Sequence, residues 1–136
     1  MADSMTSKTA LVKAAYVGHT PTAMALLDAK ANVNHADSQG YTSLAFATSF
    51  NHEELQAELL KAHADPNLQD VFGITPLMHA AARGQQDPVA LLLKNGAKPL
   101  LADSEGKTAL DYAESAQFED VAAVLRDAAT ALTRVS

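Results

Sequence analysis

The apolar residues of the chain occur in short groups with helical spacing, and polar turn residues separate the groups. Leu77 and Ala80 stand three positions apart on one helical face, and Val89, Leu92 and Leu93 follow the i, i+3, i+4 pattern of another. The pattern predicts two short helices joined by a turn. Helices this short are marginal alone, so they must bury their apolar faces against neighbouring elements.

The same pattern recurs every 33 residues along the chain. Columns that keep this step are Thr9, Thr42, Thr75 and Thr108; Ala14, Ala47, Ala80 and Ala113; and Leu26, Leu59, Leu92 and Leu125. A fixed period without insertions is typical of a solenoid, in which stacked units share one linear core. We expect one repeat domain over residues 5–129, with units at about 5–36, 37–69, 70–102 and 103–129, and a C-terminal tail at 130–136.

Each of the last three units begins with a turn of the form Asp-x-x-Gly-x-Thr, opened by Asp37, Asp70 and Asp103. The aspartate of such a turn accepts backbone N–H groups, and the glycine takes the positive φ that the reversal needs. The Thr-x-Leu that follows opens the first helix of the unit.

A second break divides each unit between its two helices. The breaks fall at Gly18, Asn51, Gly84 and Gln117. Glycine and asparagine tolerate the left-handed conformation that ends a helix. The second helix then begins near Thr20-Pro21 and Asp87-Pro88, where we expect Thr20 and Asp87 to be N-caps followed by proline at the first helical position.

Composition narrows the possible functions. Hydrophobic residues make up 48% and aromatic residues 5% of the chain, so the core consists of alanine and leucine, which favour closely packed helices. With a formal net charge of −6, the chain lacks the positive field that attracts phosphate groups, so we expect no nucleic-acid and no membrane partner. The absence of cysteine excludes disulfides and thiolate zinc sites. No stretch approaches the roughly 20 apolar residues that span a bilayer.

The third unit resembles the ankyrin repeats. It reads DVFGITPLMHAAARG over residues 70–84 and LLLKNGA over residues 91–97, and four copies of the pattern cover nearly the whole chain. Tetratricopeptide units have a similar length but lack the Asp-x-x-Gly-x-Thr turn. The resemblance implies an all-α, L-shaped solenoid of helix–turn–helix units, with β-hairpin fingers projecting from one side.

The chain departs from that family pattern in three columns. The histidine that follows Thr-Pro-Leu in the family is replaced by Val12, Ala45, Met78 and Asp111. The resemblance implies that a hydrogen bond tying helix to turn is lost. Lys30 and His63 stand in the column of Gly96, and each costs about 1 kcal/mol if the backbone is left-handed there. Leu100 replaces the asparagine of earlier units, so we expect the last hairpin to lose a side-chain link to the backbone.

The end units differ from the middle ones. Glu114 and Arg126 occupy columns that hold Ala and Leu in other units. At the start, Ser4 and Ser7 replace the Asp and Gly of the turn. Both ends therefore resemble caps of a repeat array.

Comparison of the four copies separates columns that keep one residue type, which we call framework columns, from columns that vary, which we call free columns. The free columns hold most of the large side chains. The resemblance places them on the concave side, on the fingers and at the ends of the first helices. We predict a partner-binding surface of Tyr16, Gln39, Tyr41, Phe50, Val71, Phe72, Ile74, Arg83 and Lys107, with Lys8 and Glu105 on its rim. An exposed apolar patch with a polar rim is typical of protein interfaces.

The alternative for Phe50 and Phe72 is that they fold back to fill gaps in the core. We expect Phe72→Asp and Tyr41→Asp to abolish partner binding with little loss of stability. A second column partly faces the same side and consists of Lys13, Phe46, His79 and Tyr112. Packing between repeats is the alternative there, above all for Phe46 and Tyr112.

No catalytic or metal-binding pattern emerges. The stretch from His52 to Gln56 begins like a zinc-protease helix but has glutamine where the second histidine must stand. The five histidines fall in different columns, and they are His19, His35, His52, His63 and His79. A repeat stack offers a shallow groove rather than a pocket for a nucleophile and its base. We expect no enzyme activity, no metal and no cofactor.

The function that follows is binding of another protein through the concave face and fingers, as an inhibitor or regulator. A scaffold or assembly chaperone that bridges a complex is the alternative. We expect a monomer in the cytoplasm, or in the periplasm or outside the cell if a signal peptide has been removed.

Overall fold

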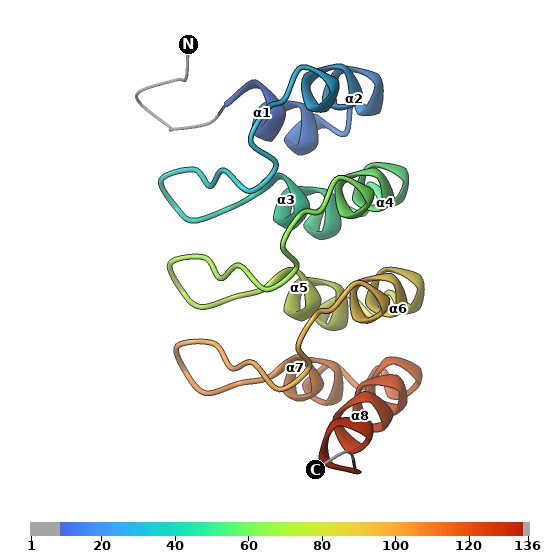
Figure 1. Cartoon of the computed structure of the whole chain (residues 1–136). Coiled ribbons are helices and arrows are strands. Elements are labelled where there is room, and N and C mark those ends of the chain that lie inside the picture. Colours follow the sequence, from blue (N-terminus) through green and yellow to red (C-terminus); the bar gives the residue numbers. More distant parts are fainter. Residues whose placement is uncertain (1–8, 135–136) are drawn as a thin grey trace.

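The computed structural model describes residues 9–134, and these residues form eight α-helices in consecutive pairs (Figure 1). The first helices of the pairs are α1 (Ala10–Val17), α3 (Ser43–Ser49), α5 (Pro76–Ala82) and α7 (Ala109–Ser115). The second helices are α2 (Thr20–Asp28), α4 (Glu53–Lys61), α6 (Gln86–Lys94) and α8 (Glu119–Arg134). The predicted all-α repeat of helix pairs is confirmed. Ser4, Ser7 and Lys8 lie outside the described residues.

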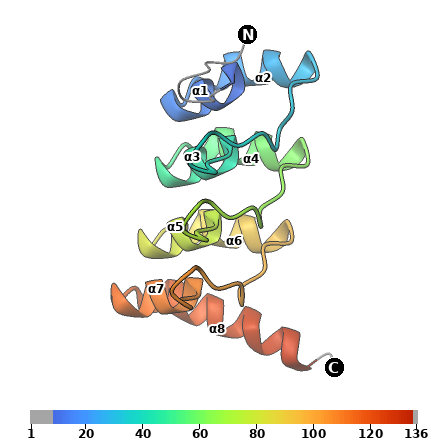
Figure 2. The same cartoon turned by 90° about the vertical axis from the view of Figure 1, so that its left-hand side faces the viewer.

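The helix pairs stack in chain order into a linear array. The first helices form one column, the second helices form a column beside it, and three loops project beyond the first helices (Figure 1). A view from the loop side shows the units one above another (Figure 2). Each first helix packs on its own second helix and on the first helix of the next unit. We call the projecting loops the second (36–42), third (69–75) and fourth (102–108) fingers.

A threonine side chain starts every first helix. The hydroxyl oxygens of Thr9, Thr42, Thr75 and Thr108 accept hydrogen bonds from the backbone N–H three residues on, at 3.1–3.3 Å. The expected loss of a helix-to-turn hydrogen bond is wrong for two units. Asp111 Oδ2 accepts from the Thr108 N–H at 2.9 Å, and Met78 Sδ accepts weakly from the Thr75 N–H at 3.5 Å. Both residues stand where the family has histidine, and in each case the acceptor atom reaches the N–H of the threonine that caps the helix.

The predicted left-handed breaks between the helices are confirmed. Gly18, Asn51, Gly84 and Gln117 have φ values of 77°, 60°, 69° and 64°. The predicted N-caps of the second helices are wrong. α2 is capped by His19, whose Nδ1 accepts from the Thr22 N–H at 3.3 Å, and α6 by Gln85 without a side-chain bond. The first N–H groups of a helix have no intrahelical partner, so proline is tolerated at several positions of the first turn. The position of a proline therefore does not by itself identify the N-cap residue.

The fingers are held by their aspartates and by each other. Asp70 Oδ1 accepts from the N–H groups of Phe72 and Ile74 at 2.8 and 2.9 Å, and Asp37 and Asp103 make the equivalent bonds. The Val71 N–H donates to Gln39 O, and the Ser104 N–H donates to Phe72 O, each at 3.0 Å. Within the described residues the hairpins contain only isolated antiparallel bridges, at Ala36–Thr42 and Ala102–Thr108.

Adjacent fingers approach so closely that glycine is required between them. A Cβ placed on Gly40 would lie 2.8 Å from the Asp70 Cα, and one on Gly73 would lie 2.8 Å from the Ser104 N. Both glycines also have positive φ, 83° and 79°. The Asp-x-x-Gly-x-Thr turn therefore sets the spacing of the fingers as well as their shape.

The two asparagines of the turn column link successive loops rather than closing their own hairpins. Asn34 Oδ1 accepts from the Asp65 N–H, and Asn67 Oδ1 accepts from the Lys98 N–H, each at 2.8 Å. Leu100 has no such oxygen and is 54% exposed. At the same end of the stack, Glu114 and Arg126 form an ion pair at 3.1 Å.

Candidate partner-binding surface

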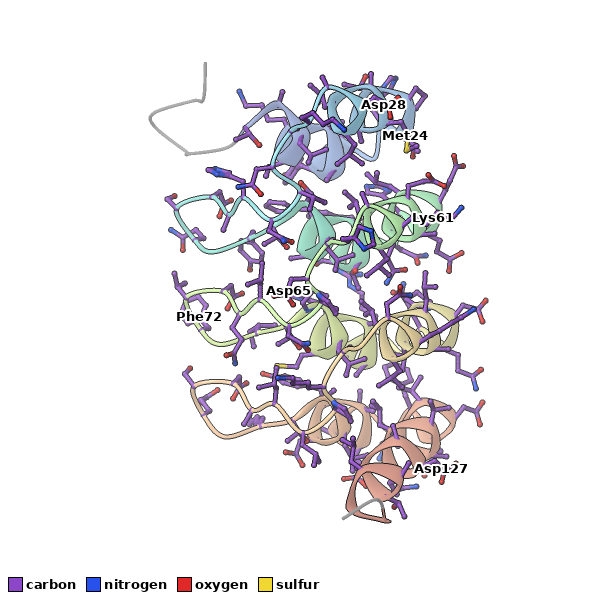
Figure 3. The ribbon with its side chains drawn as sticks, in the orientation of Figure 1. Met24, Asp28, Lys61, Asp65, Phe72 and Asp127 are labelled. Atoms are coloured by element: carbon purple, nitrogen blue, oxygen red, sulfur yellow. The ribbon has the colours of Figure 1, made fainter. Side chains whose placement is uncertain are left out.

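The predicted surface residues lie on the fingers and first helices, which together we call the finger face. Val71 and Phe72 are 57% and 62% exposed, and Phe72 stands at the outer end of the third finger (Figure 3). Tyr16 lies in the last turn of α1 and is 50% exposed, and Phe50 is the C-cap of α3 and is 44% exposed. Gln39, Arg83 and Lys107 are exposed as well. Asp28, Lys61 and Asp127 lie on the second helices, away from Phe72 (Figure 3).

Four rings form a contiguous group on the amino-terminal part of the finger face, and we call them the aromatic cluster: Tyr16, Tyr41, Phe46 and Phe50. Phe46 is 7% exposed and forms the floor. Its ring centroid lies 5.3 Å from that of Tyr16, 5.0 Å from Tyr41 and 6.1 Å from Phe50. Tyr16 and Phe50 meet edge to face at 5.2 Å. Edge-to-face and offset pairs are the favoured geometries of aromatic rings.

The predicted residues differ in how far they are buried, so some are open to a partner and others pack against the core. Tyr41 and Ile74 are partly buried and pack against the core, so only part of each side chain is open to a partner. Replacement of Tyr41 by aspartate would disturb packing, so we no longer expect that change to leave stability intact. Phe72 cannot be a core filler at its exposure, and Phe50 is half exposed on the cluster.

His79 lies at the edge of the aromatic cluster, with its ring centroid 6.1 Å from that of Tyr41. Burial lowers the pKa of His79 below its ordinary value, and the nearby charge of Arg83 lowers it further, whereas Asp70 opposes the shift. His79 Nε2 and Asp70 Oδ2 are buried without a hydrogen-bond partner among the described residues. Burial also raises the pKa of Tyr41, with Asp70 and Asp37 adding to the effect.

The same two positions form a closed pair one repeat further on. The Tyr112 hydroxyl donates a hydrogen bond to Asp103 Oδ2. This bond, with those from the Lys107 and Glu105 N–H groups, holds the pKa of Asp103 below its usual value. Burial and the same carboxylate raise the pKa of Tyr112 to about 12. Asp103 is therefore ionised and Tyr112 neutral throughout the physiological range.

A hollow of about 430 Å³ lies between the third and fourth fingers, and we call it the finger notch. It is lined by Phe72, Ile74, Asp103, Ser104, Glu105 and Tyr112. Among the predicted surface residues, Phe72 and Ile74 thus belong to the notch, and Tyr16, Tyr41 and Phe50 to the aromatic cluster. Sequence reasoning did not assign Asp103 or Ser104 to the surface. The repeat period could have indicated these residues, because each finger faces the residues that lie one repeat later in the sequence.

Metal binding and membrane insertion are not indicated in the part of the chain that the structure describes. Among residues 9–134, no group of three or more His, Asp or Glu side chains converges as a metal ion requires. Acidic side chains instead occupy the first turns of the second helices, as with Glu53 and Glu119, where they complement the helix dipole. None of the helices in this part of the chain has the length and apolar character to cross a membrane.

Comparison with known proteins identifies a family. The family model described as ankyrin repeats (three copies) matches residues 2–70 and 51–134, which is nearly the whole chain. The search of curated proteins finds no match.

Proposed function

The chain belongs to the ankyrin-repeat family, whose repeats are non-catalytic protein-interaction modules, and we propose that it binds a partner protein through its finger face. One observation carries this proposal: among the large exposed apolar side chains of the described residues, Tyr16, Phe50, Val71 and Phe72 lie on that face, whereas Leu100, Phe118 and Leu132 lie outside it. Monomers rarely expose contiguous apolar surface without using it.

The face is suited to docking because its elements are already fixed. Backbone hydrogen bonds join neighbouring fingers at Val71 and Ser104, and each described finger is closed by its aspartate. A rigid surface loses little conformational entropy on binding, so more of the contact free energy appears as affinity. Aromatic side chains at the centre of an interface commonly carry most of that free energy.

We propose that Tyr16, Phe50, Val71 and Phe72 are the main contacts. Tyr41 and Ile74 contribute their open edges, and Gln39, Arg83 and Lys107 form the polar rim, where charges set orientation more than affinity. Lys8 was predicted for the same rim and lies outside the described residues.

We further propose that binding itself is the activity, as expected of an inhibitor or regulator that covers a functional surface of its partner. The alternative is a scaffold that bridges two proteins. The two differ in stoichiometry and effect. An inhibitor binds one to one and suppresses the partner's activity, whereas a scaffold leaves that activity unchanged and holds two partners together.

Affinity capture with matched variants tests the proposal. Wild type, Phe72→Asp and Leu132→Asp are compared; Leu132 is 53% exposed on α8, away from the finger face. We expect a specific partner to be retained by wild type and Leu132→Asp and to be lost with Phe72→Asp, because a buried unpaired carboxylate opposes docking. Thermal unfolding of all three proteins shows whether they are folded.

Equal retention by Phe72→Asp and wild type would contradict the proposed surface, as would loss of the partner with Leu132→Asp alone. If Phe72→Asp unfolds, Phe72→Ser is measured in its place, because it removes the ring without adding a charge. A partner that is retained by both Phe72 variants would place the binding surface elsewhere.

A further inference from the structure

The finger notch is a preformed site with fixed walls. The bond from the Ser104 N–H to Phe72 O, at 3.0 Å, holds the third and fourth fingers side by side. The Tyr112 ring is fixed through its hydroxyl by Asp103, whose other oxygen is held by the N–H groups of Glu105 and Lys107 at 2.9 Å. A ligand entering the notch would therefore meet a surface that needs little rearrangement.

The notch combines ring surface with negative charge. Phe72, Ile74 and the Tyr112 ring supply the apolar part of its lining. The lining groups that carry charge at neutral pH are Asp103 and Glu105, and both are carboxylates. The charge of Lys107 acts on Asp103 and helps to lower its pKa, but Lys107 is not one of the residues that line the notch. The net charge of the chain, −6, adds to the attraction for a cation.

We infer that the finger notch is the subsite for an arginine side chain of the partner protein, an inference that rests on the proposed function of the finger face. A guanidinium group has flat, weakly hydrated faces that stack on aromatic rings, and its edges donate to carboxylates. Asp103 already accepts three hydrogen bonds from its own chain. Glu105, whose side chain is exposed, is therefore the main acceptor for the guanidinium. An ammonium group fits less well, because it is more strongly hydrated and cannot stack.

The neighbouring pair of fingers lacks this combination. The positions one repeat earlier hold Gln39, Tyr41, Asp70, Val71, Phe72 and His79. Val71 and Phe72 thus replace Ser104 and Glu105, so the exposed carboxylate is absent between the second and third fingers. The two ends of the finger face therefore differ in chemistry. This difference would orient the partner so that its arginine lies toward the fourth finger.

A peptide titration followed by NMR tests the arginine subsite. The probes are acetyl-Gly-Arg-Gly-amide and two matched peptides in which citrulline or lysine replaces arginine. Citrulline keeps the shape of arginine but is neutral. We expect weak binding of the arginine peptide, with shifts of the Phe72, Ser104 and Glu105 amides. We expect about threefold weaker binding for citrulline and lysine, the size expected of one exposed ion pair or one ring–cation contact.

Two variants locate the effect. Glu105→Gln should reduce the difference in affinity between the arginine and citrulline peptides, and Phe72→Ala should weaken the arginine peptide about threefold. Glu54→Gln is the matched control, because Glu54 is an exposed carboxylate in the first turn of α4. It should leave all three affinities unchanged.

The inference is overturned if the peptides cause no shifts, if the shifts lie outside the notch, or if wild type binds arginine and citrulline equally. These outcomes are distinct from failure of the proposed function. A partner that is captured by wild type and lost with Phe72→Asp would still support the finger face, whatever the peptides show.

Discussion

The amino-terminal half of the array, α1 to α4, and the carboxyl-terminal half, α5 to α8, differ both on the surface and inside. In the first half, aromatic rings contact one another over the buried Phe46, whereas in the second half rings and carboxylates line an open notch. Inside the second unit, Ser43, Thr48 and Gln56 are at most 1% exposed, and each has a side-chain atom without a hydrogen-bond partner among the described residues.

The equivalent positions of the third unit are apolar and buried: Pro76, Ala81 and Val89. At these three positions the second unit carries polar atoms where the third carries none. An unpaired buried polar atom costs about 1–3 kcal/mol. The third unit carries this cost elsewhere, at Asp70 Oδ2, His79 Nε2 and Gln85 Oε1, so the two halves differ in which positions carry it.

The largest effect should come from removal of the cluster's floor. We expect Phe46→Ala to lower the free energy of unfolding by about 3–4 kcal/mol, because the buried ring leaves a cavity and three ring contacts are lost. Chemical denaturation followed by circular dichroism measures the change. Tyr112→Ala, at the same position two units later, is the comparison and should cost less, because Tyr112 is only partly buried. A loss below about 1 kcal/mol for Phe46→Ala would show that the cluster adds little to the core.

A swap of one buried residue between the halves tests the difference inside. We expect Gln56→Val to stabilise the protein by about 1–2 kcal/mol, because the unpaired Nε2 is removed and valine already fits this position at Val89. The reverse change, Val89→Gln, should destabilise by a similar amount. Hydrogen exchange should show that protection of α3 and α4 rises in the first variant and that protection of α5 and α6 falls in the second. A stability loss in Gln56→Val would mean that the amide has a favourable role in the second unit.

The left-handed residue after α2, α4 and α6 allows a smaller correction. His63 has φ of 69° and corresponds to Gly96, which has φ of 94°. We expect His63→Gly to stabilise by about 1 kcal/mol, since glycine adopts this conformation without strain. The control is Ala62→Gly, where φ is −83° and no strain is relieved. Thermal unfolding compares the two variants, and an equal change in both would rule out relief of strain as the cause.

The features that could be predicted from the sequence depend on local geometry repeated four times. Thr9 and its equivalents cap helices, Gly18 and its equivalents take positive φ, and the leucine column is buried at Leu59, Leu92 and Leu125. Leu26, in the first unit, is only partly buried. Lys30 and His63 are strained at φ of 71° and 69°, as the glycine in their column indicated.

The features that could not be predicted depend on residues that differ between units and meet across them. The depth of Phe46 is set by rings from the neighbouring unit and finger, so its column alone did not separate packing from binding. The division of the surface into an aromatic cluster and a notch has the same origin, because Phe72 faces residues of the following unit. Asp111, in the column where the family has histidine, accepts from the Thr108 N–H with a different side chain, so the residue type of the column alone did not show that the bond is kept.

The smallest effect concerns the closed pair in the second half and is confined to high pH. The pKa of Tyr112 rises from 10 in the unfolded chain to about 12 in the folded one, because burial and Asp103 oppose the phenolate. A group with a raised folded pKa stabilises fully below its unfolded pKa and loses that contribution as pH rises through the folded value. Wild type should therefore hold a constant stability advantage over Tyr112→Phe up to about pH 10 and lose it toward pH 12. Ultraviolet titration should show one tyrosine in wild type that ionises at unusually high pH and is absent from Tyr112→Phe. A stability advantage of wild type that stays constant to pH 12 would place the phenol outside the influence of Asp103.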